Sequence, residues 1–177
     1  MNQTSSEIFP LLKTKRLELR CLLISDSEDV FRLRTDKEVN KFIERPVSRT
    51  DKNGKEFVER INKSSADNNV YYWVISFIEN AKLIGTICLW NFNEDKSVAE
   101  VGYDLFPEHQ SKGIMTEAMN AVLNFGFNTA GFKIIEAFTH LDNMASKQIL
   151  IKNGFEEVKN RVDNENENNI IFVKQND

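Results

Sequence analysis

The chain has 177 residues, of which 41% are hydrophobic, a size and composition that suit one domain with a buried core. Its formal net charge of -4 argues against a general binder of nucleic acids or anionic membranes, because such proteins are normally basic. Residues 1–10 lack the basic and apolar regions of a signal peptide, and no apolar run is long enough to span a bilayer. We therefore expect a soluble cytoplasmic protein that binds neither nucleic acid nor membrane.

The cysteines and histidines bear on redox state and metal binding. Cys21 and Cys88 lie far apart, each in an apolar, strand-like run, which predicts buried thiols in a reducing compartment rather than a disulfide. His109 and His140 have no Cys or His neighbour at metal-ligand spacing. We therefore predict no metal site.

The N-terminal part of the chain is expected to be a loose leader over residues 1–11, followed by a single domain over residues 12–177. Lys15–Leu23 alternates charged and apolar residues, which indicates a half-buried strand. Ser25–Asp26 is predicted to cap a first helix, and Thr50–Asp51 is predicted to start a second one.

The middle of the chain predicts three antiparallel strands joined by short turns. These are Tyr71–Ile78, which is rich in aromatic and β-branched residues, Lys82–Asn91 and Val98–Phe106. A helix follows, and then a further strand at Phe132–Thr139. A strand that follows a helix can pair in parallel with the strand before that helix, through a right-handed crossover.

The C-terminal part predicts a short helix at Ala145–Lys152, stopped by Asn153–Gly154. Closing strands are expected at Phe155–Arg161 and Ile170–Lys174, with the solvated hairpin loop Asp163–Asn169 between them. The fold class is therefore α/β (α+β). We expect a mixed, mainly antiparallel central sheet of about six to seven strands with helices on both faces.

The stretch Tyr103–Gly126 indicates an anion site. Pro107 ends the strand because it has no amide hydrogen to donate, and Gly113 allows the backbone to come close to a ligand. The helix that follows, expected from Thr116, begins with unpaired amide groups at the positive end of its dipole. A phosphate or pyrophosphate would suit such a site. An ordinary strand-to-helix turn is the alternative.

Several short motifs occur in the order and spacing of a known family. The chain resembles the GCN5-related N-acetyltransferases (GNAT), and within them the RimJ/RimL ribosomal-protein-like branch, from about Leu12 to Lys174. The motifs are Lys15–Arg20, Ala99–Tyr103, Gly113–Ala118, Asn143–Ser146 and Gly154–Phe155. The family's turn is usually Gln/Arg-x-x-Gly-x-Gly/Ala, whereas this chain has Met115 at the last position. If that backbone approaches a pyrophosphate, the Met115 side chain must point away from it.

The resemblance implies that acetyl-CoA is the cosubstrate. Its pyrophosphate would lie on the turn residues Gln110, Ser111, Lys112, Gly113, Ile114, Met115 and Thr116. Its pantetheine would lie between two splayed parallel strands, bonded to Asn143 and to the backbone of Tyr103, Asp104 and Leu105. A backbone amide there would also polarise the thioester carbonyl.

The resemblance also implies the catalytic groups. Transfer to an amine needs a base for the amine and an acid for the leaving thiolate. We predict Glu100 as the base, with Asp104 as an alternative on the same strand face. Many relatives carry a tyrosine as acid where this chain has Leu150, and we instead predict Ser146, as in the RimL-like branch. A salt-bridged carboxylate and a plain first-turn serine remain the structural alternatives.

The acceptor is expected to be a protein N-terminal α-amine or a small amine such as a polyamine, amino acid or antibiotic. Its specificity would come from residues 25–65 and the 163–169 hairpin, and Trp90 and His140 could border the acceptor site. The alternatives are a CoA-binding sensor or scaffold without turnover, and a partner-binding domain in which the turn binds nothing. The protein is expected to be a monomer or a homodimer.

Overall fold

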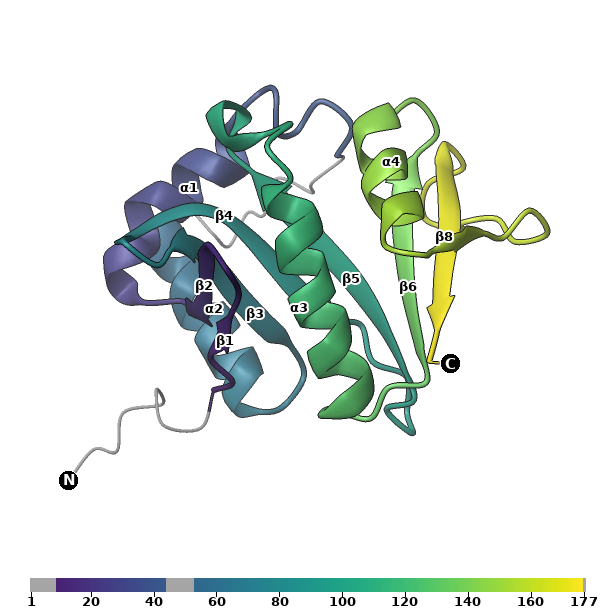
Figure 1. Ribbon diagram of the computed structural model, residues 1–177, viewed down its shortest axis with the longest axis horizontal. Coiled ribbons are helices and arrows are strands. Elements are labelled where there is room, and N and C mark those ends of the chain that lie inside the picture. The colour runs from purple at the N-terminus through teal and green to yellow at the C-terminus, as the bar shows by residue number, and fades with distance from the viewer. Residues whose placement is uncertain (1–8, 44–52, 177) are drawn as a thin grey trace.

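The computed structural model describes residues 9–43 and 53–176. Within these residues, eight strands form one sheet in the order β1-β2-β3-β4-β5-β6-β8-β7 (Figure 1). The strands are β1 (Leu12–Lys13), β2 (Leu17–Cys21), β3 (Tyr71–Phe77), β4 (Asn80–Trp90), β5 (Val98–Leu105), β6 (Ile134–His140), β7 (Glu156–Glu157) and β8 (Asn169–Gln175). The α-helices are α1 (Ser27–Thr35), α2 (Gly54–Ala66), α3 (Ile114–Asn128) and α4 (Met144–Lys152). Short 3-10 helices lie at Ile24–Asp26 and Pro107–His109.

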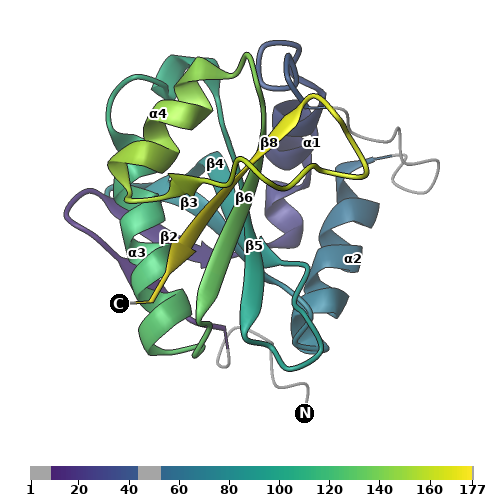
Figure 2. The same cartoon turned by 90° about the vertical axis from the view of Figure 1, so that its right-hand side faces the viewer.

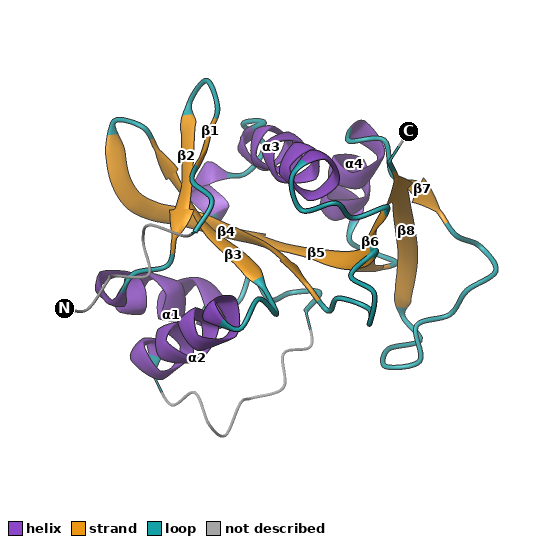
Figure 3. Ribbon diagram, turned by 90° about the horizontal axis from the view of Figure 1, so that it is seen from below, coloured by secondary structure: helices purple, strands orange, loops and turns teal. Residues whose placement is uncertain are grey.

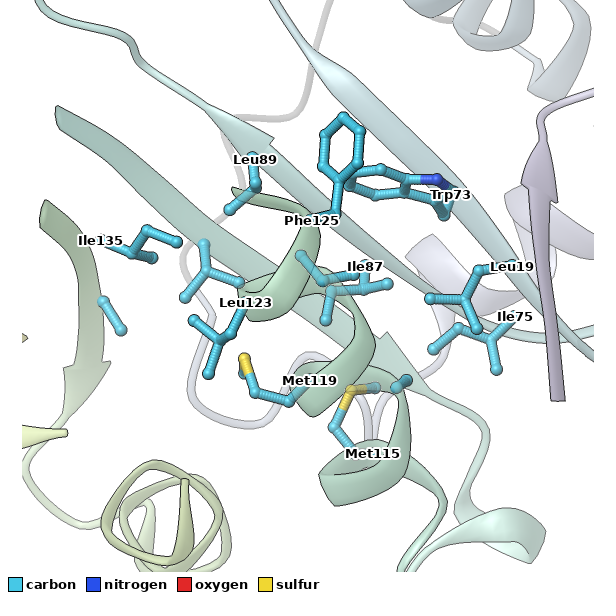
Figure 4. Close-up of a cluster of buried hydrophobic side chains, with 14 of the residues drawn as sticks. Leu19, Trp73, Ile75, Ile87, Leu89, Met115, Met119, Leu123, Phe125 and Ile135 are labelled. Carbon is cyan, nitrogen blue, oxygen red and sulfur yellow. The ribbon is translucent and has the colours of Figure 1, made fainter. Parts of the chain in front are cut away.

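Helices cover both faces of the sheet. Figures 2 and 3 show α3 and α4 on one face and α1 and α2 on the other. Side chains that alternate along the strands belong to two separate hydrophobic cores, one on each face of the sheet. Trp73 and Ile75 of β3 pack toward α3, while Tyr72 and Val74 pack toward α1 and α2. Figure 4 shows the α3 core, in which buried helix side chains meet those of the strands. The predicted mixed α/β fold is confirmed.

The pairing of the strands is antiparallel everywhere except at one position. Strand β5 pairs in parallel with β6, and α3 makes the crossover between them. This parallel ladder is short, because it joins only Val98–Glu100 to Ile134–Glu136. Beyond it the two strands spread apart toward their carboxyl ends (Figure 1).

Helix α1 begins where the sequence predicts, with Asp26 at the N-cap position, whereas the start of α2 differs from the prediction. The Asp26 carboxylate makes no capping hydrogen bond to α1; it accepts hydrogen bonds from the Arg20 guanidinium and from the amide of Leu23, each at 2.8 Å. Helix α2 has Asn53 as its N-cap, with Oδ1 accepting from the Glu56 amide at 3.0 Å. Thr50–Asp51, where this helix was expected to start, lies outside the described residues.

Other boundaries shift for identifiable reasons. Strand β1 was not predicted, so the sheet has one strand more than the expected maximum of seven. Strand β7 has only two residues, Glu156–Glu157, of the predicted strand Phe155–Arg161. Of the expected leader, residues 1–8 lie outside the described part of the chain. Phe9 packs edge-on against Trp73, whose Nε1 donates to the Pro10 carbonyl at 2.7 Å. None of the described helices is long and apolar enough to cross a membrane.

Candidate active site

A cavity of about 1090 Å³ lies where β5 and β6 diverge. Its lining comes from both faces of the sheet: the turn before α3, the strands β3 to β6, one side of α4, residues of α1 and α2, and the 163–169 hairpin. The parallel pairing of β5 with β6 ends at Glu100. Beyond this residue, the backbone edge of β5 that faces β6 has no neighbouring strand to pair with. An extended ligand could therefore bond to that edge like a strand.

The turn before α3 forms one end of the cavity. Ser111 (φ 59°) and Gly113 (φ 71°) both have left-handed backbone conformations, and Gly113 is the N-cap of α3. The helix therefore begins at Ile114, two residues before the predicted start. Its first amides have no partner within the helix and lie at the positive end of a 15-residue dipole. Such an end binds anions, phosphates above all.

Most of the predicted turn residues line this cavity. They are Gln110, Ser111, Gly113, Ile114, Met115 and Thr116. The Gln110 side chain donates from Nε2 to the Leu105 carbonyl at 3.0 Å, which ties the turn to the end of β5. Met115, the departure from the family pattern, is only 4% exposed, and its side chain belongs to the α3 core (Figure 4). The Met115 side chain thus points into the core and leaves its backbone open to a pyrophosphate.

Two cations lie near this turn, Arg16 and the turn residue Lys112, and neither is among the cavity-lining residues. The Lys112 Nζ donates to the Glu108 carbonyl at 2.6 Å. The Arg16 guanidinium lies 3.7 Å from the position that a Cβ on Gly113 would take, and it donates to the Lys112 carbonyl at 3.1 Å. Arg16 also pairs with Glu117 at 2.7 Å.

The Glu117 carboxylate holds this cation in place. Partial burial alone would raise the pKa of Glu117, but hydrogen bonds from Thr14 and Arg16 outweigh burial and lower it. Sequence reasoning missed Arg16 because its partners lie about a hundred residues further along the chain, beyond any local pattern.

The predicted catalytic residues lie on opposite faces of the sheet. Because strand side chains alternate, Glu100 and Asp104 of β5 share the face covered by α1 and α2. Tyr103 points to the other face, where its hydroxyl lies 2.8 Å from Ser146 Oγ of α4. All four residues line the same cavity, which therefore connects the two faces through the opening between β5 and β6.

Glu100 has the electrostatic properties of a base that works near neutral pH. Burial raises its pKa to about 7, opposed by a hydrogen bond from Asn91 Nδ2 at 3.2 Å. The carboxylates of Asp163, Glu136 and Glu165 raise it further by repulsion. A carboxylate with such a pKa in a cavity is a candidate for proton transfer, whereas a salt-bridged structural carboxylate would have a lowered pKa.

Ser146 is held by the start of α4. Asn143 is the N-cap, and its Oδ1 accepts from the Ser146 amide at 3.1 Å. Asn143 and Ser146 both line the cavity, and Ser146 is 9% exposed. Burial raises the pKa of Tyr103 to about 12, so its phenol stays protonated at neutral pH. Sequence reasoning placed only the Tyr103 backbone at the site and missed this hydroxyl.

The part of the cavity on the α1 and α2 face carries aromatic and charged groups. Trp90 is 45% exposed there, and His140 also lines the cavity, in line with the sequence expectation for both. Across the described ranges, no group of three or more His, Cys, Asp or Glu residues could hold a metal ion.

Comparison with known proteins gives the class of the protein, an N-acetyltransferase, and its family. The family model described as "Acetyltransferase (GNAT) domain" matches residues 16–156. The chain therefore belongs to the GNAT acetyltransferases, which are enzymes that use acetyl-CoA.

Relatives from Bacillus subtilis (strain 168) agree with this assignment. The uncharacterized N-acetyltransferase YnaD is 32% identical over 143 residues, which cover 81% of each chain. The uncharacterized N-acetyltransferase YoaA is 29% identical over 149 residues, or 84% of each chain. A solved structure of RimL, a ribosomal L7/L12 α-N-protein acetyltransferase in complex with coenzyme A, has the same fold. It superposes with a TM-score of 0.78 and is 16% identical, over 94% of this chain and 98% of that one.

Proposed function

We propose that this N-acetyltransferase binds acetyl-CoA in the cavity described above and transfers the acetyl group to a primary amine by direct attack in a ternary complex. The favoured acceptor is a protein N-terminal α-amine, as in the RimJ/RimL branch. One observation carries the proposal: a single cavity joins the N-terminus of α3 on one side of the sheet to Glu100 on the other.

The donor would lie across the opening between the strands. The amides at the start of α3 and the Arg16 guanidinium would bind the pyrophosphate. The pantetheine would bond to the free edge of β5 over Tyr103, Asp104 and Leu105. Asn143 would donate through Nδ2, since its Oδ1 already accepts from Ser146. This arrangement places the thioester beside Ser146 on one face and within reach of an amine from the other.

The reaction needs the amine to arrive with a free electron pair. Glu100 would take the ammonium proton, directly or through a water molecule, and a carboxylate with a pKa of about 7 is half ionised at neutral pH. The neutral amine nitrogen attacks the thioester carbon, and a C–N bond forms. As the C–S bond breaks, its electron pair goes to sulfur. The second proton of the attacking nitrogen goes to the thiolate through the Ser146 hydroxyl, which donates its own hydrogen to sulfur and receives that proton, so that a neutral amide and the CoA thiol leave. Asp104, on the same face as Glu100, is the alternative base.

The charge around Glu100 suits a cationic acceptor. Asp163 and Glu165 of the hairpin are close enough to raise the pKa of Glu100, so an incoming ammonium group meets a negative potential. A peptide N-terminus carries such a group. A polyamine also does, and the same carboxylates make a small polycationic amine the second candidate.

Calorimetric titration with acetyl-CoA, with dephospho-CoA as the control ligand, tests the donor site. Saturable one-to-one binding is expected, and absence of binding at millimolar ligand would reject the proposal that the cavity binds acetyl-CoA for catalysis. Thiol release with peptides carrying different N-terminal residues, compared with polyamines, then identifies the acceptor. Tight donor binding without thiol release for any amine would instead support a CoA sensor or scaffold.

A further inference from the structure

The hydrogen bond between Tyr103 and Ser146 links β5 to α4 across the cavity. The residues are 43 positions apart, and their hydroxyl oxygens lie 2.8 Å from each other. The Asn143 cap fixes the first turn of α4 and therefore the position of Ser146. Packing against the α3 core fixes the ring of Tyr103. Both partners are thus held before any ligand binds.

Two hydroxyl groups can share a hydrogen bond in either of two directions, and the direction matters for chemistry. A serine hydroxyl has one hydrogen and two lone pairs. If Ser146 donates to Tyr103, its oxygen presents only lone pairs to the cavity and repels a developing thiolate. If Tyr103 donates to Ser146, the serine hydrogen stays available for a group in the cavity.

The surroundings of the two groups favour the second direction. Burial raises the pKa of Tyr103 to about 12, so the phenol keeps its hydrogen at neutral pH and is able to donate it. A thiolate that forms beside Ser146 attracts the serine hydrogen, and the hydrogen bonds of such a chain then polarise one another.

We propose that Tyr103 is a positioning residue that donates its O–H to Ser146 Oγ and thereby directs the single Ser146 hydrogen toward the sulfur of bound coenzyme A. This inference rests on the proposed function. In the transfer step, Glu100 takes the ammonium proton, the C–S electron pair goes to sulfur, and the second nitrogen proton reaches the sulfur through Ser146. The Tyr103 hydroxyl loses no proton; it acts through Ser146.

The ionisation of bound coenzyme A gives a test that needs no knowledge of the acceptor. The thiol of CoA is titrated on the intact protein by the ultraviolet absorbance of its thiolate, for the wild type and for Ser146→Ala, Tyr103→Phe and the double variant. A donated hydrogen bond stabilises the thiolate, so Ser146→Ala should raise the bound thiol pKa by about one unit. Tyr103→Phe should raise it by a smaller amount, and should add nothing in the Ser146→Ala background.

Kinetics with any amine that supports turnover give a second readout. Tyr103→Phe should lower kcat by about 3- to 10-fold with little change in the KM for acetyl-CoA, because the lost effect is confined to the leaving group. The matched control is Tyr71→Phe, since Tyr71 loses the same hydroxyl but stacks on Trp73 and does not line the cavity. The control should resemble the wild type in both measurements.

The outcomes separate this inference from the proposed function. A wild-type protein that does not bind CoA would overturn both. A wild type that lowers the pKa of the bound CoA thiol below that of free CoA, together with a Tyr103→Phe variant that gives the same thiol pKa as the wild type, would overturn only the role of Tyr103. A Tyr103→Phe effect on the thiol pKa that adds to the effect of Ser146→Ala would likewise overturn only that role. If Tyr103→Phe does not fold, Tyr103→Met removes the same hydroxyl and is read in the same way.

Discussion

Arg16 and Glu117, 101 residues apart, join the start of β2 to the first turn of α3. The Arg16 amide and Nε donate to the two oxygens of Glu117 at 2.9 and 2.7 Å, while Nη1 donates to the Lys112 carbonyl at 3.1 Å. The Arg16 side chain thereby bonds to Lys112, directly before Gly113, and to Glu117, four residues after it. The brace fixes the turn whose amides would bind the pyrophosphate.

Replacing Arg16 with alanine should weaken acetyl-CoA binding by about 5- to 50-fold, because it removes both the brace and a positive charge beside the anion site. Calorimetry at low and high salt measures the effect, which should shrink as salt screens the lost charge. The control is Lys55→Ala, which removes an exposed cation of α2 paired only loosely with Glu59 at 4.0 Å. Equal affinities for the two variants would mean that Arg16 has no part in donor binding.

Gly113→Ala offers a second test of the same turn. Gly113 and Gly131 both have positive φ, 71° and 82°, so an alanine at either position should cost about 1 kcal/mol of folding stability. A Cβ on Gly113 would lie at the turn and near Arg16, whereas a Cβ on Gly131 would have nothing within 4 Å. Urea unfolding should therefore give similar losses for both variants, and calorimetry should give a loss of acetyl-CoA affinity for Gly113→Ala alone. A similar loss of affinity in Gly131→Ala would refute a specific role for the turn.

The elements with local signals could be predicted from the sequence. Alternation and β-branched residues predicted the strands at Tyr71–Ile78 and Lys82–Asn91, and a helix between two strands predicted the parallel pair. The start of α3 was predicted two residues late, because only the fold shows that Gly113 adopts the left-handed conformation of the N-cap. Strand β1 has two residues, too few for any periodic pattern.

Part of the candidate site could likewise be predicted from the sequence and part could not. The turn before α3 and the Asn143–Ser146 segment are each a continuous stretch of chain, so a sequence motif can identify them. Arg16, Asn91 and the Tyr103 hydroxyl act through side chains that come together only in the folded sheet. The raised pKa of Glu100 was equally beyond the sequence, since it depends first on burial and then on carboxylates of the distant 163–169 hairpin.

Glu100→Gln keeps the size of the side chain but removes its proton acceptor. It should lower kcat/KM for the amine by about 10²- to 10⁴-fold, the usual contribution of a positioned base. Acetyl-CoA affinity should change little. The control is Glu157→Gln, because Glu157 is an exposed β7 carboxylate outside the cavity lining. A Glu100→Gln variant with full activity would shift the role of base to Asp104 or to water.

The wild-type kcat/KM should rise with pH and level off above a pKa of about 7, because only ionised Glu100 accepts a proton. Asn91→Gly removes the hydrogen bond that favours the carboxylate, so it should move this limb to higher pH; glycine also tolerates the left-handed φ of 51° at this position. Glu165→Gln removes a repelling charge and should move the limb to lower pH. Shifts in the same direction for both variants would show that the limb does not belong to Glu100.

The same pKa predicts how stability depends on pH. Folding raises the pKa of Glu100 from 4.5 to about 7, so the contribution of its neutral form is fully present below 4.5 and is lost as pH rises through 7. Glu100→Gln cannot ionise and avoids this loss. Relative to the wild type, it should therefore gain about 1 to 3 kcal/mol of unfolding free energy between about pH 5 and pH 9. Urea unfolding at both pH values measures the gain, with Glu157→Gln again as the control. A difference between Glu100→Gln and the wild type that stays constant with pH would mean that Glu100 is solvated and ionises in the folded protein as it does in the unfolded chain.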